Sequence, residues 1–503
     1  MKIPDAVQIR GIDAYTIKHE PVSSIDLMER AAKKCFERIK NLVKPQTKIM
    51  VFCGPGNNGG DGLAIARMLA GTGQQVVVYL LGLSDENSQD FRINLKRLEK
   101  SGKSKIEKLQ AKESLPEIPQ DALVIDALFG TGLNRPLEGF AAEVVQHINQ
   151  SEAKVVSIDM PSGMFTNDNG SNNPKNIIRA NRTLTFQFPK LAFLLPECEV
   201  FVGHWEVLDI GLHIDAIRGI NTRYHLTEAQ DIRSYYRPRS KFSHKGNYGH
   251  ALLLAGSSGK SGAAVLAAGA ALRSGAGLLT AHMPSSLLPI LQTALPEAMC
   301  RADSDAHIIT SPGDLQAFNA IAFGPGTGTD AQTGNTLKLL IQNSVFPLVI
   351  DADGLNILAQ NPTWLAFLPK GSILTPHPKE FERIAGKSAD GFQKLETARE
   401  LAIKYGINWV LKGAHTAVVG PDGQIYFNST GNPGMATGGS GDVLTGIILG
   451  WLAQGYPPLQ AALIGVYLHG LAGDMAASRM GMEGMIAGDI LFHLPKATKK
   501  VFS

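Results

Sequence analysis

Short apolar runs alternate with helical patterns over the first part of the chain, from about residue 48 to residue 212. Apolar residues at helical spacing follow the first run at 63–71, and residues 13–43 before it also predict a helix. Strands that alternate with helices are typical of a mostly parallel sheet with right-handed crossovers. The predicted strands span residues 48–54, 75–82, 122–130, 153–163 and 182–190.

A charged segment rich in arginine, residues 213–245, interrupts this rhythm. A second alternation follows, with Ala- and Gly-rich helical stretches at 263–275 and 443–455. We therefore expect a domain boundary near residue 220, so that residues 1–220 and 221–503 form two α/β domains, of which the second is larger. The predicted strands of the second half span residues 250–257, 277–284, 320–326, 347–354, 372–378, 408–413 and 416–420.

The length of 503 residues exceeds what one hydrophobic core usually supports, so two or three domains are expected. The net charge is only +3, which gives no electrostatic reason to expect nucleic acid or an anionic membrane as a partner. The four cysteines are widely spaced, which argues against a disulfide framework or a zinc site and favours reduced thiols. Neither a signal peptide nor a membrane-spanning segment is predicted, so we expect a cytoplasmic protein that acts on small molecules.

The first chemical motif is the glycine-rich segment GPGNNGGDG, residues 54–62, between a predicted strand and a predicted helix. Such a turn offers free backbone N–H groups to an anion. Gly54, Gly56 and Gly59 also satisfy the G-x-G-x-x-G pattern of dinucleotide-binding folds. That pattern requires an acidic residue at the end of the next strand, which the strand at 75–82 lacks. A conventional hydride-transferring domain is therefore disfavoured.

Polar residues also follow two later strands. Asp126 comes shortly before GTGLNRP at 130–136, and Asp159 comes shortly before Pro161-Ser162-Gly163. With NNGGDG, this makes three polar clusters at the carboxyl ends of strands, where open α/β sheets bind ligands. Asp, Asn and Ser oxygens are ligands for a hard cation, although each cluster alone is equally typical of a turn or a helix cap.

In their order, NNGGDG, VIDALFGTGLNRP and SIDMPSG resemble the signatures of the NAD(P)H-hydrate epimerase family, the YjeF N-terminal domain, over about residues 10–212. The resemblance implies a Rossmann-like three-layer fold that interconverts the R and S hydrates of NADH and NADPH (NADHX and NADPHX). It implies that Asn58, Asp126 and Ser162 bind K⁺. Asp126 is then the candidate for proton transfer at the epimerised carbon, because the ion favours its ionised form. The residues implied in substrate binding are Asn57, Asn58, Gly59, Gly60, Asp61, Gly130, Thr131, Gly132, Leu133, Asn134, Arg135, Pro136 and Asp159.

The second motif, NPGMATGGSGDVLTG at 432–446, leads into the helix predicted at 443–455. Its glycines bring backbone amides to a helix N-terminus, which forms a cradle for an anion. Asp442 stands at the mouth of this cradle, where a carboxylate could take a proton from a hydroxyl that attacks a phosphoryl group. A plain N-cap aspartate is the alternative. GSSGKS at 256–261 is not a P-loop, because Leu254 stands where that motif needs glycine.

The ordered motifs GPGTGT, VIDADGLN, LTPHPKEF, LKGAHT and GGSGD resemble those of the ADP/ATP-dependent NAD(P)H-hydrate dehydratase family over about residues 225–503. The resemblance implies a ribokinase-like fold in which Asp442 activates the hydroxyl of the S hydrate. This hydroxyl attacks the terminal phosphate of ADP or ATP, and the phosphate ester then leaves to restore NADH or NADPH. Mg²⁺ is expected with the nucleotide. The residues implied in nucleotide binding are Lys412, Gly413, Ala414, His415, Thr416 and Gly441, and those implied in facing the hydrate are Ala263, Gly326, His377 and Asp442.

Together the resemblances predict a bifunctional repair enzyme whose epimerase supplies the S form that its dehydratase consumes. Two alternatives stay open: a small-molecule kinase of the ribokinase-like type, and a first half that only binds or assembles. The fused arrangement favours ADP over ATP without deciding between them, and NADHX is not ranked against NADPHX. Lys379, where the family commonly has glycine, and Lys260 are expected to face solvent. We also expect a homo-oligomer, because the apolar Ala- and Gly-rich helices could pack between subunits.

Overall fold

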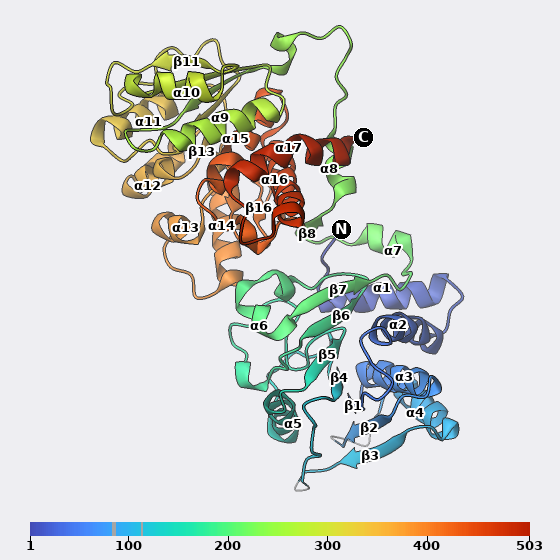
Figure 1. Ribbon diagram of the computed structural model, residues 1–503. Helices are drawn as coiled ribbons and strands as arrows, with labels where there is room; N and C mark the ends of the chain where they lie inside the picture. Colours follow the sequence, from blue (N-terminus) through green and yellow to red (C-terminus); the bar gives the residue numbers. More distant parts are fainter. Residues whose placement is uncertain (83–86, 112–113) are drawn as a thin grey trace. The chain divides into compact units, whose positions relative to one another are not determined.

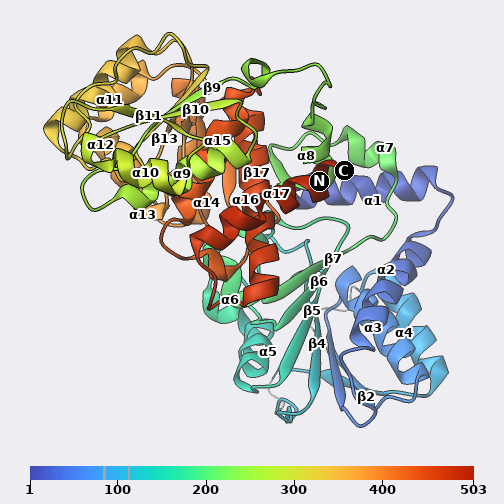
Figure 2. The same ribbon diagram turned by 45° about the horizontal axis from the view of Figure 1, so that its top comes forward.

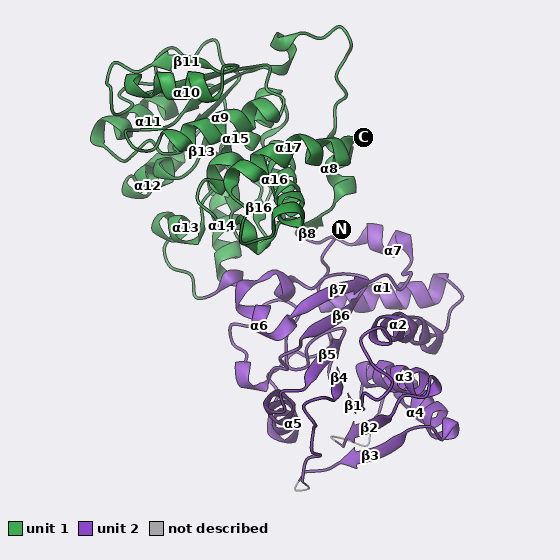
Figure 3. Cartoon of the chain, viewed as in Figure 1, with its two compact units in different colours: residues 1, 223–389, 393–503 green, residues 2–222, 390–392 purple. Residues whose placement is uncertain are grey.

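The computed structural model describes residues 1–82, 87–111 and 114–503. It divides into two compact units, which Figure 3 colours separately. The N-terminal unit contains residues 2–222 and 390–392, and the C-terminal unit contains residue 1 with residues 223–389 and 393–503. Each unit has its own sheet and its own buried core.

The N-terminal unit is built on a seven-stranded sheet in the order β3-β2-β1-β4-β5-β6-β7, and all neighbouring strands pair in parallel. The chain enters the sheet in the middle, builds outward to β3, and then returns to the other side of β1 (Figures 1 and 2). The order therefore reverses between β1 and β4, which is where such sheets bind ligands. The strands are β1 (Ile49–Cys53), β2 (Val76–Leu81), β3 (Lys105–Leu109), β4 (Leu123–Ala127), β5 (Lys154–Ile158), β6 (Arg182–Phe186) and β7 (His204–Leu208).

Helices cover both faces of this sheet, which gives three layers (Figure 1). Val51 of β1 packs among side chains of α2, α3 and α4, whereas its neighbour Phe52 packs among side chains of α5. Because both faces of the central strands are buried, their sequences are continuous apolar runs. The helices are α1 (Ala6–His19), α2 (Ser24–Ile39), α3 (Asn57–Gly71), α4 (Gln89–Ser101), α5 (Gly139–Gln150), α6 (Glu199–Val202) and α7 (Ile214–Gly219).

The C-terminal unit has a ten-stranded sheet in the order β11-β10-β9-β12-β13-β14-β15-β16-β17-β8. Strands from β11 to β15 pair in parallel, and β16 is antiparallel to both of its neighbours. Here the order reverses between β9 and β12. The strands are β8 (Tyr224–Thr227), β9 (His250–Leu254), β10 (Leu278–Met283), β11 (Met299–Ala302), β12 (Ala320–Phe323), β13 (Leu348–Ile350), β14 (Ile373–Leu374), β15 (Asn408–Leu411), β16 (Ala417–Val419) and β17 (Ile425–Asn428).

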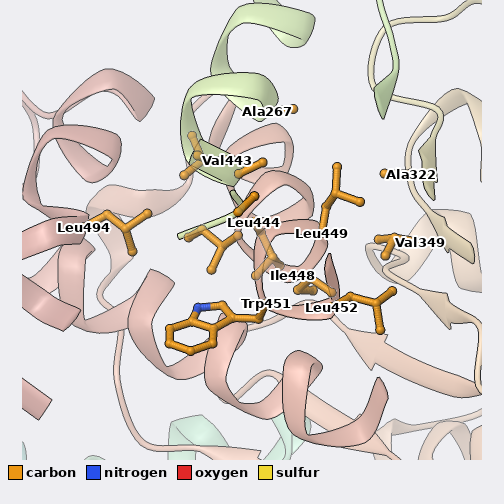
Figure 4. Packing of buried hydrophobic residues seen from close by; sticks show 14 of the residues in the cluster. Ala267, Ala322, Val349, Val443, Leu444, Ile448, Leu449, Trp451, Leu452 and Leu494 are labelled. Atoms are coloured by element: carbon orange, nitrogen blue, oxygen red, sulfur yellow. The ribbon is translucent and has the colours of Figure 1, made fainter. Parts of the chain in front are cut away.

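The main core of this unit forms where α9, α15, α16 and α17 pack on the sheet and on one another. Figure 4 shows Val443, Leu444, Ile448, Leu449 and Trp451, all from α15, within this core. A helix that is apolar all round must be buried all round, which explains why α15 lies at the centre. The helices are α8 (Ala229–Tyr235), α9 (Ser261–Arg273), α10 (Leu288–Ala294), α11 (Ala331–Asn343), α12 (Asp353–Gln360), α13 (Pro378–Ala385), α14 (Gly391–Tyr405), α15 (Ser440–Ala453), α16 (Pro458–Met480) and α17 (Ala487–Phe502).

The α/β class with parallel sheets is confirmed, but two predicted helices need correction. The single helix expected over 13–43 is two helices, α1 and α2. Pro21 lies between them and has no N–H to continue a helix, and Ser23 caps α2 by accepting the N–H of Asp26. The helix expected at 63–71 begins at Asn57, so NNGGDG forms its first turns.

Five strands were not predicted: β3, β7, β8, β11 and β17. The first four form the edges of the two sheets. An edge strand needs no continuous apolar run, because it is only partly buried, and these four carry polar or charged residues.

Among the described residues, no helix is long and apolar enough to cross a bilayer. All four cysteines are free, and Cys35, Cys53 and Cys198 are buried. Burial raises the pKa of each of these three thiols, so they pack as small apolar side chains.

We predict that Gly446→Ala destabilises the C-terminal unit by more than about 2 kcal/mol, as overpacking of a tight core does. A Cβ at Gly446 of α15 would lie 2.0 Å from the carbonyl oxygen of Ala267 in α9, and backbone cannot move aside as a side chain can. Urea unfolding followed by tryptophan fluorescence measures the effect. Gly262→Ala is the matched control, because nothing lies within 4 Å of its added Cβ. Equal midpoints for Gly446→Ala and the wild type would contradict the prediction.

Candidate active sites

The first candidate site lies at the reversal point between the carboxyl ends of β1 and β4. Two glycines allow a close approach there. A Cβ on Gly54 would lie 1.9 Å from the Leu128 carbonyl oxygen, and a Cβ on Gly59 would lie 1.8 Å from the Gly54 carbonyl oxygen. The loop after β1, the start of α3 and the loop after β4 therefore pack directly on one another.

Asn58 presents a buried amide at this point. Neither its Oδ1 nor its Nδ2 has a hydrogen-bond partner among the described residues. The side chain lies against the backbone of Gly130, where an added Cβ would be 3.5 Å from Oδ1. A buried polar group left without a partner costs about 1–3 kcal/mol. The amide of Asn58 is therefore available to a group from outside the chain.

Asp126, the next candidate, is completely buried at the end of β4. Its Oδ2 accepts hydrogen bonds from the Ser157 hydroxyl (2.7 Å) and the Ser162 N–H (2.9 Å). Its Oδ1 accepts from the Ser162 hydroxyl (2.5 Å) and the Leu128 N–H (3.3 Å). Burial raises the pKa of Asp126, and the hydrogen bonds from the two serines and the backbone oppose that shift. Asp126 thus ties the loop after β4 to the loop after β5.

Ser162 connects this network to Asn58. Its hydroxyl also accepts the N–H of Phe129 (2.8 Å), and Phe129 directly precedes the Gly130 that touches Asn58. The structure therefore brings together the three residues predicted to bind K⁺. An unpartnered amide oxygen beside a carboxylate and a hydroxyl is a donor set that fits a hard cation.

The residues predicted to bind the substrate differ in what surrounds them. Gly59 and Gly60 are buried against protein, and a Cβ at Gly60 would lie 2.8 Å from Met28 Sδ. Leu133 packs on the core beneath α5. Residues of the predicted set that are exposed or half-buried, so that a ligand can reach them, are Asn57, Gly130, Thr131, Gly132, Asn134, Arg135 and Pro136.

Asp159 and Asp61 complete the predicted set and lie close to a third acid, Asp13 of α1. Burial raises the pKa of Asp61 well above its ordinary value, and the charges of Asp159 and Asp13 raise it further. Burial also raises the pKa of Asp13 to about 6, with Asp159 adding to the shift and Lys190 opposing it. Asp159 itself forms an ion pair with Lys190 (2.8 Å).

The second candidate site lies at the carboxyl ends of the parallel strands of the C-terminal unit. The loops after β9 and β12 meet there, because Ser257 donates to the Gly326 carbonyl oxygen (2.7 Å). Gly326 has a positive φ of 64°, and its added Cβ would lie 3.0 Å from the Cβ of Ala263. Ala263 and Gly326, predicted separately, are therefore neighbours.

The same unit contains a cavity of about 770 Å³, and the described residues that line it do not include Ala263, Gly326 or Asp442. It is lined by the whole segment 412–416, by Gly441 and by His377. All six residues predicted to bind the nucleotide thus line one cavity. The amino end of α15 opens on it, where Gly439, with a φ of 90°, precedes the first turn. A helix N-terminus with free N–H groups favours an anion at this place.

Asp442 lies in the first turn of α15, close to three charged groups. Burial raises its pKa to about 6, with Asp351 and Asp353 adding to the shift and Lys412 opposing it. The Lys412 Nζ is held 2.9 Å from Asp351 Oδ1, and the Thr445 hydroxyl donates to Asp351 Oδ2 (2.7 Å). Asp351 therefore fixes both the lysine of the cavity and the helix that carries Asp442.

Asp353, two residues after Asp351, contacts a different set of residues. It accepts the Gly328 N–H (2.8 Å) and pairs with Lys260 (3.0 Å), so Lys260 is tied to the first residue of α12 instead of only facing solvent. Ala352 between the two acids has a φ of 48°, a strained backbone that turns their side chains to different partners.

His377 is the N-cap of α13. Its Nδ1 accepts the N–H groups of Lys379 and Glu380, and its backbone N–H donates to Glu380 (2.8 Å). The structural role therefore accompanies, and does not exclude, a position on the cavity wall. Lys379 is exposed.

Comparison with known proteins agrees with both sites. A family model described as NAD(P)H-hydrate dehydratase matches residues 251–496, and one described as YjeF-related protein N-terminus matches residues 24–192. The bifunctional NAD(P)H-hydrate repair enzyme of Moorella thermoacetica is 38% identical over 98% of this chain and 96% of its own. That of Escherichia coli (strain K12) is 32% identical over 98% of this chain and 91% of its own. The chain belongs to this family of bifunctional NAD(P)H-hydrate repair enzymes.

Among solved structures, a ribokinase-like superfamily protein from Enterococcus faecalis is similar to the C-terminal unit of this repair-enzyme chain. It has 29% identity and a TM-score of 0.50, and the match covers 56% of this chain and 98% of that protein. The predicted fusion of an epimerase-type and a ribokinase-like dehydratase-type domain is confirmed.

Several residues of this repair-enzyme chain escaped the sequence analysis. Lys190 ends the predicted strand 182–190 without any motif around it. His469 and Val466 line the cavity from α16, about thirty residues after the glycine motif. Only the tertiary structure brings them there. Asp351 could have been found, since it lies within the quoted motif VIDADGLN, but nothing in the sequence pairs it with Lys412.

We predict that Asp126→Asn destabilises the N-terminal unit by about 1–3 kcal/mol, whatever its effect on activity. Each carboxylate oxygen accepts a backbone N–H, from Ser162 or from Leu128. An asparagine NH₂ must therefore face one of these donors in either orientation. Hydrogen–deuterium exchange of residues 123–127 under increasing urea measures the loss. Ser157→Ala, which removes a single hydroxyl donor, is the control and should lose less. Unchanged exchange in Asp126→Asn would show that the network does not stabilise the unit.

Proposed function

We propose that the C-terminal unit dehydrates the S hydrate of NADH or NADPH at the expense of ADP or ATP, and that the N-terminal unit interconverts the R and S hydrates. The observation that carries the proposal is the position of Asp442. It stands at a helix N-terminus that opens on the 770 Å³ cavity, beside the lysine of that cavity. A carboxylate in this position can deprotonate a hydroxyl as the hydroxyl attacks a phosphoryl group.

The dehydration then needs two steps. Asp442 takes the proton of the hydrate's hydroxyl while its oxygen bonds to the terminal phosphorus, and AMP or ADP leaves. The phosphate ester next leaves the ring as inorganic phosphate, pushed by the ring nitrogen, and loss of a ring proton restores the double bond. The amides at the start of α15 and the Lys412 ammonium stabilise negative charge on the transferred group. The fused architecture favours ADP as donor.

Metal ions would assist both reactions. Asn58, Asp126 and Ser162 would hold K⁺, which the unpartnered amide of Asn58 supports. Mg²⁺ would arrive with the nucleotide and neutralise the phosphates, since it is commonly bound through phosphates and one or two carboxylates. Among the described residues no cluster of three or more His, Cys, Asp or Glu could hold a metal by itself.

The remaining residue roles that we propose are divided between dehydration in the C-terminal unit and epimerisation in the N-terminal unit. Asp442, His377, Ala263 and Gly326 would face the hydrate, and residues 412–416 with Gly441 would hold the nucleotide. In the N-terminal unit Asp126 would work beside K⁺, and segments 57–61 and 130–136 with Asp159 would hold the hydrate. A homo-oligomer stays a prediction.

The test is the recovery of reduced-nicotinamide absorbance from a chemically hydrated NADPH mixture with Mg²⁺, K⁺ and either ADP or ATP. Recovery of both hydrates would support both activities and identify the donor. Recovery of the S portion alone would leave the N-terminal unit as a binding module. A stable phosphorylated product without absorbance recovery would identify a kinase and reject the dehydratase.

We predict that Asp442→Asn lowers the dehydratase kcat by about 10²–10⁴-fold, the usual worth of a general base, and leaves epimerisation unchanged. The asparagine keeps the shape of the side chain but cannot accept the proton. Dehydration of purified S hydrate and R-to-S conversion are measured on the same preparation. Asp422→Asn, which alters an exposed carboxylate in the turn between β16 and β17 that does not line the cavity, serves as the control. A full dehydratase rate in Asp442→Asn would remove Asp442 from the chemistry.

The dehydratase should also lose activity as the pH falls through about 6, because Asp442 must be ionised to accept a proton and burial raises its pKa to about 6. Lys412 lowers that pKa and Asp353 raises it. Lys412→Met should therefore move the acid limb of the kcat profile to higher pH, and Asp353→Asn should move it to lower pH. The profiles are measured at saturating nucleotide. A shift of both variants in the same direction would contradict the assignment.

A further inference from the structure

Lys190 is a charged residue buried almost completely, at 1% exposure, in the N-terminal unit. It follows β6, and its Nζ donates to Asp159 Oδ1 (2.8 Å) and to the Thr185 hydroxyl (2.6 Å). The carbonyl oxygens of Phe188 (3.2 Å) and Phe186 (3.3 Å) complete the set. Burying an ammonium is costly, and a protein tolerates it only where partners surround the charge. Four oxygens do so here.

The partner, Asp159, is held in an unusual way. Its backbone has a φ of 63°, which a non-glycine residue adopts only at a cost of about 1–3 kcal/mol. Oδ1 accepts hydrogen bonds from Lys190, from the Thr185 hydroxyl (3.2 Å) and from the Phe186 N–H (3.3 Å). No described residue donates to Oδ2. The carboxylate is therefore fixed by one oxygen while the other is left for a ligand.

Acids of other elements lie near Asp159. Asp61 of α3 and Asp13 of α1 both lie close enough to Asp159 to feel its charge. Burial raises the pKa of Asp61 well above its ordinary value, and Asp159, Asp13, Asp90 and Glu29 raise it further. The side chain of Asp61 forms no hydrogen bond within the described part of the chain. The Lys190 ammonium is the cation buried among these acids, and it offsets the charge that Asp159 carries.

We propose that Lys190 is a positioning residue of the epimerase: it anchors Asp159 by Oδ1 so that Oδ2 exchanges a proton with the hydroxyl of the hydrated ring. The proposal rests on the epimerase activity proposed above. It assigns to Asp159 the proton transfer that the sequence analysis gave to Asp126, whose two oxygens are already engaged by four donors.

A single carboxylate oxygen is sufficient for the reaction, because the hydroxyl and the ring nitrogen are bonded to the same carbon. Oδ2 takes the hydroxyl proton, the oxygen forms a carbonyl, and the carbon–nitrogen bond breaks with its electron pair passing to nitrogen. The same proton then moves from Oδ2 to that nitrogen. After the aldehyde turns, the nitrogen attacks its other face and the proton returns to oxygen. No atom or electron is gained or lost, as an isomerisation requires.

The test is a double-mutant cycle on the full chain. Lys190→Met and Asp159→Asn should each lower kcat for R-to-S conversion, by about 10–10² and 10²–10⁴-fold, with KM changed less than about threefold. Because Lys190 acts through Asp159, adding Lys190→Met to Asp159→Asn should cost less than about threefold more. Lys190→Arg should restore part of the loss. Lys154→Met, an exposed lysine at the start of β5, is the matched control.

The outcomes separate this proposal from the previous one. A wild-type chain that does not interconvert the hydrates rejects the epimerase itself. An active wild type with unchanged kcat in Lys190→Met, or with fully multiplicative losses in the double variant, rejects the positioning role. Dehydration of the S hydrate, measured on the same preparations, controls for the amount of active C-terminal unit in each variant. If Lys190→Met does not fold, Thr185→Val, which removes a hydroxyl bonded to both members of the pair, should lower kcat about tenfold, and an unchanged kcat rejects the role.

Discussion

The hydrogen bonds between the buried Asp126 carboxylate and the loops after β4 and β5 determine the form of the N-terminal site. Parallel strands end at one edge of a sheet, and the turns that follow them have backbone N–H groups without strand partners. One ionised side chain can satisfy several of them. The C-terminal unit uses the same solution, because Asp351 at the end of β13 holds Lys412 from the loop after β15 and Thr445 from α15. In each unit a buried carboxylate joins segments that are distant in sequence.

A carboxylate with both oxygens hydrogen-bonded has a different role from one with a free oxygen. Asp126 and Asp351 are nearly inaccessible and bonded on both oxygens, so each stabilises the arrangement around it. One oxygen of Asp159 accepts hydrogen bonds, and the other accepts none from the described residues. Asp442 lies in the first turn of a helix whose amino end opens on a cavity. These less satisfied groups are the ones that can exchange a proton with a ligand. The unpartnered amide of Asn58 belongs with them, because it needs a group that the chain does not supply.

Glycine has a related function in both units. Gly54 and Gly59 let α3 begin directly against β1 and β4, and Gly446 lets α15 lie against the backbone of α9. In both cases a helix whose amino end opens on a candidate site is fixed by backbone contacts that a side chain would prevent. The close packing of the core and the position of the site are thus set by the same residues.

The sequence by itself determined the α/β class, the pairing of a Rossmann-like half with a ribokinase-like half, the bifunctional family and most of the motifs that line the sites. Apolar runs indicate burial on both faces of a strand, and glycine-rich segments with polar residues indicate local backbone geometry. Both signals are local.

Partly buried edge strands such as β3 carry no such run, and the break at Pro21 within the predicted helix was overlooked. Lys190 and His469 were missed for a different reason. Their sites depend on partners far along the chain, and the pairing of Asp351 with Lys412 depends on which strands lie side by side. Only the tertiary structure decides that order, because it results from packing the whole sheet and not from any single segment.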